Sequence, residues 1–224
     1  MSFLILVRHG QSVWNLEKKF TGWVDVDLTK NGQLEAKKAG LLIKNENIEI
    51  NIYYSSLQLR ANNTLKIIQK ILSDQKNFTK AWQLNERHYG ALTGLNKVEI
   101  AQKIGESKVH EFRRSWDLKP EPISKESPHH PLNIKAYRDV PKEKIPDTES
   151  LKDTYERVMK YFNEEIKKKL IKEILKNDEP SKRAWQLNER HYGALTGLNK
   201  DEMRKKLGEE KIHQFRRSWD LRPD

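Results

Sequence analysis

The chain has 224 residues, of which 36% are hydrophobic and 33% charged, and its net charge is +11 at pH 7. This length accommodates one sizeable domain or two small ones. The sequence contains no cysteine, which excludes disulfides and thiolate metal sites. No apolar run is long enough for a signal-peptide core or a membrane span, so the composition favours a cytoplasmic protein that does not engage membranes.

The positive charge allows two interpretations. It indicates either an anionic partner or a lysine-rich composition with solvated helix faces, and for the lysines as a class we favour the second. A nucleic-acid binder would need a basic stripe interleaved with exposed aromatic residues. The aromatic residues of this chain fall inside other motifs, so we expect no nucleic-acid partner.

The first third of the chain alternates strand and helix patterns. Phe3–Val7 is a continuous apolar run that predicts a buried parallel strand, and a helix is predicted over 32–44, with Leu34, Leu41 and Leu42 near one face. A second short strand is predicted over 50–54. Ser55 or Ser56 then caps a helix whose apolar stripe comprises Leu57, Ala61, Leu65, Ile68 and Leu72. This order predicts an α/β fold with a parallel sheet and helical crossovers.

Further along, two short helices are predicted over 97–104 and 107–116, with Gly105 as the stop between them. Prolines recur over 120–146 without any period, which predicts a long loop of the kind that often forms a lid or is disordered. Ser150 caps a long helix, whose predicted apolar face comprises Leu151, Tyr155, Val158, Phe162, Ile166, Leu170 and Ile174.

An internal duplication follows. Residues 81–120 recur at 184–223, and 31 of the 40 positions are identical in a residue-by-residue comparison. A near-identical pair without a third copy is a duplication and not a solenoid, whose repeats drift and need several units. We therefore expect an incomplete catalytic domain over 1–178. The copy over 179–224 is a separate region, for which poor folding is one expected outcome.

The polar residues after Phe3–Val7 form a candidate site. His9 stands at the carboxyl end of the predicted strand, where open α/β sheets place their ligands. Gly10 would let a ligand approach the backbone, and Arg8 supplies a planar fork of donors suited to phosphate. Gln11, Ser12 and Asn15 add polar groups. Taken alone, this motif is equally compatible with a capped strand end that carries a structurally satisfied histidine.

A longer series of motifs adds context. It comprises Arg8–Asn15, Phe20–Thr29, Tyr54–Arg60, Leu84–Lys97, Arg113–Trp116 and Pro146–Leu151. In this order the series closely resembles cofactor-dependent phosphoglycerate mutases of the histidine phosphatase superfamily, from Met1 to about Leu170. The resemblance implies a three-layer α/β/α fold around a mostly parallel central sheet. It also implies interconversion of 3- and 2-phosphoglycerate in glycolysis and gluconeogenesis, with 2,3-bisphosphoglycerate as primer and no metal.

The resemblance implies roles for individual residues. His9 resembles the nucleophile that carries the phosphoryl group, and Glu86 the general acid and base. The phosphoryl group would be held by Arg8, Asn15 and Arg60, with Gly10, Gln11 and Ser12 beside them. The rest of a small phosphorylated carboxylic acid would be met by Thr21, Gly22, Arg87, His88, Tyr89, Lys97, Arg113 and Arg114. The family also allows a homo-oligomer.

One part of the family pattern is absent. The resemblance implies a second histidine on a His-Gly-Asn-Ser segment after another apolar strand, and no His-Gly pair follows His9 in this sequence. This absence bears against turnover by the chain. It also predicts an open sheet edge with unpaired backbone groups, which invites aggregation. The alternatives are an inactive chimeric or truncated copy that only binds anions, and a histidine-type phosphatase of the same superfamily.

Overall fold

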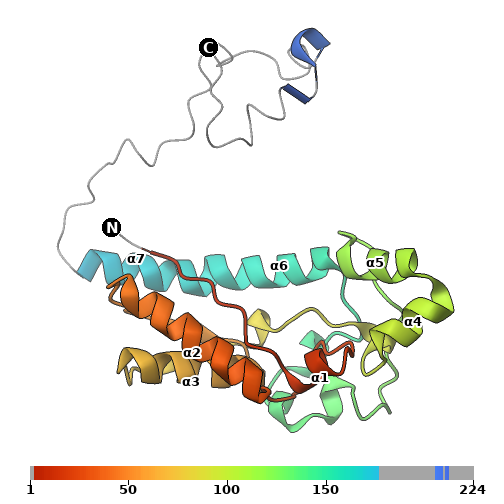
Figure 1. Cartoon of the computed structure of the whole chain (residues 1–224), viewed down its shortest axis with the longest axis horizontal. Helices are drawn as coiled ribbons and strands as arrows, with labels where there is room; N and C mark the ends of the chain where they lie inside the picture. Colours follow the sequence, from red (N-terminus) through yellow and green to blue (C-terminus); the bar gives the residue numbers. More distant parts are fainter. Residues whose placement is uncertain (1–2, 177–204, 209, 212–224) are drawn as a thin grey trace. The chain divides into compact units, whose positions relative to one another are not determined.

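The computed structural model describes residues 3–176, 205–208 and 210–211. The chain divides into two units, 1–178 and 179–224, and the elements below belong to the first unit. Figure 1 shows these elements, coloured along the sequence. The duplicated copy at 184–223 lies outside the described residues, apart from the short stretches at 205–208 and 210–211.

The sheet of the first unit consists of two parallel strands. β1 (Tyr53–Ser55) pairs with β2 (Phe78–Lys80), so that Tyr53 lies opposite Phe78. Helix α3 (Leu59–Leu72) forms the crossover between them, as a parallel pair requires. The predicted α/β class with a parallel sheet is confirmed. The strand predicted over 50–54 is also found, although it begins later and is shorter.

The predicted strand at Phe3–Val7 is wrong. The segment has no strand structure, and its side chains are between 37% and 85% exposed, with Leu6 the most exposed. Among the described residues, the backbone of 3–8 makes no hydrogen bond. An apolar run becomes a buried strand only when neighbouring strands pair with it and cover its faces. The segment does not join the sheet, which is therefore smaller than the predicted central sheet.

Helices α2 (Lys30–Asn45) and α3 pack side by side (Figure 1). Thr29 caps α2, because its hydroxyl accepts a hydrogen bond from the backbone of Gly32. The buried side of α2 comprises Gly32, Ala36 and Gly40, and a Cβ on Gly40 would lie 3.0 Å from that of Ile71. Small residues thus bring the two helices close together. The apolar residues of the predicted face, Leu34, Leu41 and Leu42, are exposed instead.

The buried side of α3 is largely polar and comprises Arg60, Asn62, Thr64, Ile68 and Gln69. The helix begins after Gln58, whose side chain makes no capping hydrogen bond, so the predicted cap at Ser55 or Ser56 is wrong. Because Arg60 and Thr64 lie one turn apart, they face the same side. Because both are buried, this side of α3 faces the residues that follow the N-terminal segment.

The predicted helix pair in the middle of the chain is confirmed. α4 (Lys97–Ile104) is capped by Asn96 and ends at Gly105, whose φ of +88° suits glycine. α5 (Glu106–Arg114) follows directly, one or two residues offset from its predicted range. The short helix α1 (Val13–Leu16) and the 3-10 turns η1 (Trp82–Leu84) and η2 (Gly90–Leu92) complete this half.

The proline-rich stretch at 120–146 has a defined structure and packs into the core. It contains three 3-10 turns, η3 (Pro131–Asn133), η4 (Lys135–Tyr137) and η5 (Lys142–Lys144). Tyr137, Val140 and Ile145 from this stretch pack with Trp23 in one buried cluster. The hydroxyl of Tyr137 also donates to the carbonyl of Trp23 at 2.5 Å. The stretch therefore supplies much of the core.

A long helical arm completes the unit. α6 (Leu151–Tyr161), the π-helical turn η6 (Phe162–Ile166) and α7 (Lys167–Lys176) follow one another without a break (Figure 1). As predicted, Ser150 caps the arm, and Asp153 completes the reciprocal capping box. None of the described helices is long and apolar enough to cross a membrane.

Candidate active site

His9 follows the extended N-terminal segment, and two hydrogen bonds define its ring. Nδ1 lies 2.7 Å from the carbonyl of Gly10, and Nε2 lies 3.2 Å from Nε of Arg60. A carbonyl can only accept and a guanidinium can only donate. His9 is therefore neutral in this arrangement, with its proton on Nδ1 and a lone pair on Nε2. Nε2 is the nitrogen able to act as a nucleophile.

Burial lowers the pKa of His9 below its usual value. The charges of Arg60 and Arg8 act in the same direction. The carbonyl of Gly10 and the carboxylate of Glu86 oppose this shift. The net effect keeps the imidazole neutral and nucleophilic near neutral pH.

Arg60 connects the groups around His9. Its side chain is fully buried, and it donates to the carbonyls of Val24 (2.9 Å) and Gly22 (2.8 Å) as well as to His9. Nη2 also forms an ion pair with Oε2 of Glu86 at 2.9 Å. Because its fork is planar and every bond has a different partner, Arg60 has one orientation.

Glu86 extends toward His9 from the loop formed by residues 82–88. Its Oε2 lies 4.0 Å from Nε2 of His9, and its side chain is about one-third exposed. Gln58 helps to place the loop, because its side-chain oxygen accepts from the backbone of Glu86 (3.2 Å) while its nitrogen donates to Gly22 (2.7 Å). Gly22 has a φ of +53°, which an L side chain adopts only with strain. A proton donor and acceptor thus lies beside the nucleophile.

A hollow of about 260 Å³ opens beside His9 and is lined by Arg8, Gln11, Asn15 and Glu35. The predicted residues Arg8 and Asn15 therefore share a surface with His9. Glu35, on α2, was missed by the sequence analysis. It accepts a hydrogen bond from the backbone of Gln11 at 2.7 Å. No sequence signal separates it from other exposed helix carboxylates.

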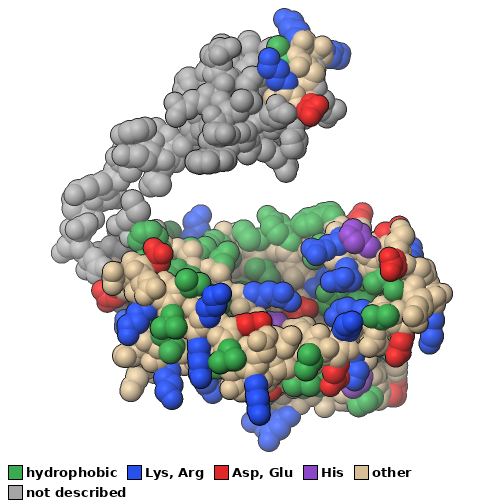
Figure 2. Space-filling model, viewed as in Figure 1, with side chains coloured by type: hydrophobic (Ala, Val, Ile, Leu, Met, Phe, Trp, Pro, Cys, Tyr) green, Lys and Arg blue, Asp and Glu red, His purple; other side chains and the backbone are tan. Residues whose placement is uncertain are grey.

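Positive groups lie on another side of Glu86. Burial lowers the pKa of Lys97, and the nearby charges of Arg113 and Arg8 lower it further. Glu86 opposes this effect. Burial raises the pKa of Tyr89, whose ring lies under the guanidinium of Arg87. Of the predicted substrate residues, Tyr89, Lys97 and Arg113 are thus close to one another. Figure 2 shows Lys and Arg side chains toward α4 and α5 on this face.

Arg87 and Thr21 hold unused polar atoms near these groups. Nη2 of Arg87 donates to the carbonyl of Phe112 at 2.7 Å, whereas its Nε and Nη1 are buried without a hydrogen-bond partner. The hydroxyl of Thr21 is buried without a partner as well. Unsatisfied buried donors cost free energy, and an anionic ligand would satisfy them. These atoms have the chemistry to bind a phosphate or carboxylate group, but neither residue lines the hollow beside His9.

Several predicted site residues have another place in the structure. Ser12 is fully buried, and its hydroxyl caps α1 by accepting from the backbone of Asn15. A Cβ on Gly10 would overlap the carbonyl of Gly32, so the close approach at this glycine is to α2. His88 is fully buried against Trp23, and its Nδ1 accepts from the backbone of Gly90. These three residues therefore help to hold the site in place through their packing and hydrogen bonds.

The outcome for Arg114 differs from that for Arg113. Both end α5 and are exposed, yet only Arg113 influences the pKa values of Lys97 and Tyr89. Among the described residues, the side chain of Arg114 makes no hydrogen bond or ion pair. The described residues also contain no cluster of three or more His, Cys, Asp or Glu side chains able to hold a metal.

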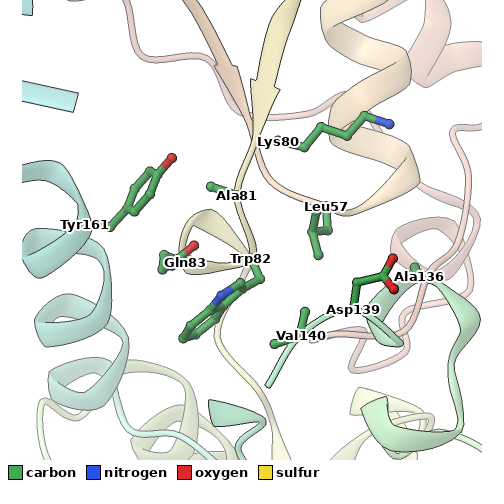
Figure 3. Close-up of a pocket in the computed structure, with 9 residues that line it drawn as sticks. All are labelled: Leu57, Lys80, Ala81, Trp82, Gln83, Ala136, Asp139, Val140 and Tyr161. Carbon is green, nitrogen blue, oxygen red and sulfur yellow. The ribbon is translucent and has the colours of Figure 1, made fainter. Parts of the chain in front are cut away.

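A second hollow, of about 280 Å³, lies at the start of the same loop. It is lined by Leu57, Lys80, Ala81, Trp82, Gln83, Ala136, Asp139, Val140 and Tyr161 (Figure 3). Its lining contains no histidine and no arginine, whereas His9 and Arg8 both line the hollow beside His9. The chemistry of phosphate recognition therefore points to the hollow beside His9.

Comparison with known proteins places this site in a family. Residues 4–130 match the model of the histidine phosphatase superfamily (branch 1). The 2,3-bisphosphoglycerate-dependent phosphoglycerate mutase of Pelagibacter ubique (strain HTCC1062) is 66% identical over 170 residues, covering 76% of this chain and 71% of the relative. The protein of the same name from Borreliella burgdorferi (strain ZS7) is 49% identical over 169 residues, covering 75% and 68%.

The fold agrees with this relationship. An Escherichia coli K-12 structure, proposed to be an alpha-ribazole-5′-P phosphatase, aligns with a TM-score of 0.51 at 16% identity, covering 73% of this chain and 66% of that one. At this identity the likeness concerns the fold alone. The matched sequence, the arrangement around His9 and the relatives lead to one assignment. The chain belongs to branch 1 of the histidine phosphatase superfamily, and its relatives there are named 2,3-bisphosphoglycerate-dependent phosphoglycerate mutases.

Proposed function

We propose that this chain interconverts 3-phosphoglycerate and 2-phosphoglycerate by carrying a phosphoryl group on His9. The observation that carries the proposal is the arrangement of three groups. Nε2 of His9 has its lone pair free of a proton, Arg60 lies 3.2 Å away, and Glu86 lies 4.0 Å away. A nucleophile, a phosphate-binding cation and a proton-transferring carboxylate are what phosphoryl transfer through histidine needs.

The transfer step follows from these positions. Nε2 attacks the phosphorus atom, an N–P bond forms, and the bond from phosphorus to the substrate oxygen breaks. Glu86 delivers a proton to that oxygen, and in the reverse direction it removes the proton from the attacking hydroxyl. Since Arg60 donates to Nε2, this hydrogen bond must break before Nε2 attacks, and the freed N–H then faces the incoming phosphoryl group. The charge on those oxygens is then stabilised by Arg60 and Arg8.

The rest of the substrate would be held by the second group of cations. Lys97, Arg113 and the unpaired Nε and Nη1 of Arg87 offer donors to a carboxylate and a distant phosphate. The same donors fit 2,3-bisphosphoglycerate, the highly anionic compound in the names of the relatives. This compound would supply the first phosphoryl group. We extend the proposal to a reaction without metal, in the cytoplasm, on a small phosphorylated acid.

The direct test follows conversion of 3- to 2-phosphoglycerate by the full chain in the presence of 2,3-bisphosphoglycerate. We expect turnover that disappears in His9→Ala and falls about 100- to 10,000-fold in Glu86→Gln. Arg138→Gln is the matched control, because this exposed arginine pairs with Asp139 and is not among the predicted site residues. Equal activity of His9→Ala and the unmodified chain would overturn the proposal.

The same assay separates the alternatives. Release of inorganic phosphate without formation of 2-phosphoglycerate would identify a histidine-type phosphatase, in which water takes the phosphoryl group. Binding of 3-phosphoglycerate by a folded chain without either product would identify an inactive copy. Either result rejects the mutase proposal for this chain, although its family membership would stand.

A further inference from the structure

The loop that carries Glu86 is held from behind by one arginine of α6. Nη1 of Arg157 lies 2.8 Å from the carbonyl of Gln83 and 3.2 Å from that of Asn85. A longer contact of 3.4 Å reaches the carbonyl of Trp82. Figure 3 shows Trp82 and Gln83 at the start of this loop, near Tyr161, which lies on α6 as Arg157 does. The three carbonyls on one guanidinium nitrogen fix the loop just before Glu86.

Glu149 holds the loop just after Glu86. Its Oε2 accepts a hydrogen bond from the backbone of His88 (2.9 Å), and its own backbone donates to the carbonyl of His88 (3.1 Å). Glu149 and Arg157 also form a two-pronged ion pair at 2.7 and 2.8 Å, with both side chains less than 10% exposed. The pair therefore clamps residues 83–88 at both ends.

Burying such a pair is costly unless every polar atom has a partner. Here the guanidinium also lies over the ring of Trp23, 5.4 Å from its centre. Arg60, on the other side of the loop, binds the Glu86 carboxylate but not the loop backbone. The clamp and Arg60 therefore perform separate tasks, one on the backbone and one on the side chain.

We propose that Arg157 and Glu149 are positioning residues, which hold residues 83–88 so that the Glu86 carboxylate stands beside Nε2 of His9. Neither residue touches the reacting atoms. A shift of about 1 Å at a catalytic group can lower a rate about 100-fold, so the clamp matters for the reaction. The inference rests on the proposed function for its catalytic consequence, but the positioning itself can be measured without turnover.

The measurement is the pKa of His9, followed by NMR of the imidazole in the full chain. The charges that shift the pKa of His9 are those of Arg8, Arg60 and Glu86, and of these only Glu86 raises it. Glu35 also lines the hollow beside His9, but neither Arg157→Met nor Glu86→Gln changes it. If Arg157→Met releases the loop, the carboxylate moves away and the pKa of His9 falls. Glu86→Gln should produce a fall in the same direction. The double variant should fall no further than Glu86→Gln.

A matched control separates positioning from general loss of stability. Tyr53→Phe removes a hydrogen bond to Asp74 that involves no site residue, so it should leave the pKa of His9 unchanged. If Arg157→Met does not fold, Arg157→Lys serves, because an ammonium keeps the charge but loses the two-pronged pair. An unchanged pKa of His9 in a folded Arg157 variant, lysine or methionine, would overturn the inference.

Turnover provides the second readout. In an active chain, Arg157→Lys should lower kcat about 100-fold with little change in KM, because the cationic side chains that bind the substrate are unchanged. A chain that turns over nothing, but whose His9 pKa falls in the Arg157 variants, would reject the proposed function and keep the positioning. A chain that turns over normally in those variants would reject the positioning and keep the function.

Discussion

The two residues proposed to carry out the reaction, His9 and Glu86, lie in segments that are held in place to very different degrees. His9 follows the segment 3–8, which is extended and mostly apolar and makes no backbone hydrogen bond among the described residues. Glu86 lies in an irregular loop whose backbone is bound by Gln58, Glu149 and Arg157. The segment whose sequence pattern predicts a regular strand is thus held by fewer hydrogen bonds than the irregular loop.

The difference shows what holds a segment in place. A strand depends on partners that its own sequence does not contain, and without them its backbone groups face solvent and its apolar side chains stay exposed. Apart from the 3-10 turn η1, the loop at 82–88 has no regular structure, yet side chains from three other segments bind its backbone. Order in this molecule follows hydrogen-bond satisfaction and burial, and regular secondary structure is only one way to reach them.

The largest effect should come from breaking the clamp on the loop. Glu149→Ala leaves Arg157 buried without its ion-pair partner and the backbone of His88 without an acceptor. We expect a loss of about 3–5 kcal/mol in the free energy of unfolding, measured by urea denaturation. Asp139→Ala, which removes a highly exposed partner of Arg138, should cost less than about 1 kcal/mol. Similar losses in both variants would contradict the importance of the clamp.

The burial of His88 in the loop predicts a dependence of stability on pH. Burial, helped by the charge of His130, lowers the pKa of His88 to about 4 from its ordinary value of 6.5. Between these values the unfolded chain binds a proton that the folded chain does not, so stability falls as the pH falls. The difference corresponds to about 3 kcal/mol at the acidic end.

His88→Gln tests this dependence, because its amide oxygen can still accept from the backbone of Gly90. The free energy of unfolding of the unmodified chain should decrease more steeply than that of the variant between pH 6.5 and 4. Parallel curves for the two proteins would mean that His88 does not resist protonation and that the loop admits water.

The turn at Gly22 joins the loop to the rest of the site. Gly22→Ala should cost about 1–2 kcal/mol for its positive φ, and the added Cβ would crowd the backbone of Tyr89 at 3.2 Å. Gly105→Ala is the control for activity, since its backbone (φ +88°, ψ +146°) is also strained for alanine but nothing lies within 4 Å of a Cβ. Urea denaturation should show a loss of stability in both variants, and activity should fall only in Gly22→Ala. Unchanged activity of Gly22→Ala would show that crowding at Tyr89 is unimportant.

The smallest effect is expected in the N-terminal segment. Leu6 is 85% exposed, so Leu6→Lys should change the free energy of unfolding by less than about 0.5 kcal/mol. Ile68→Ala, at a residue of α3 that is 3% exposed, should cost about 2–5 kcal/mol. Sedimentation should also show less self-association after Leu6→Lys, because a charge protects an open edge. A large loss of stability at Leu6 would mean that the segment is buried.

Local signals predicted the elements that are determined locally. Gly105 ends α4, Ser150 begins α6, and both follow from the chemistry of one or two residues. The burial of Phe3–Val7 was predicted wrongly because it depends on distant neighbours. The packing of the 120–146 stretch around Trp23 was missed for the same reason, since proline-rich patterns do not show which apolar residues meet.

The candidate site shows the same division. The roles of His9 and Glu86 were implied by the resemblance to a family, while the pattern around His9 alone left a structural role equally open. Glu35 and Arg157 were missed, because their partners are backbone groups distant in sequence. The resemblance also implied a substrate role for His88, but the loop turns its ring into the core.

The most direct measurement is the transfer of a phosphoryl group to His9. The full chain is incubated with 2,3-bisphosphoglycerate, and its intact mass and peptides are determined under conditions that preserve acid-labile phosphate. The proposed chemistry predicts the gain of one phosphoryl group, located on His9 and absent from His9→Ala. A folded chain that binds 2,3-bisphosphoglycerate but gains no phosphoryl group on His9 would contradict it.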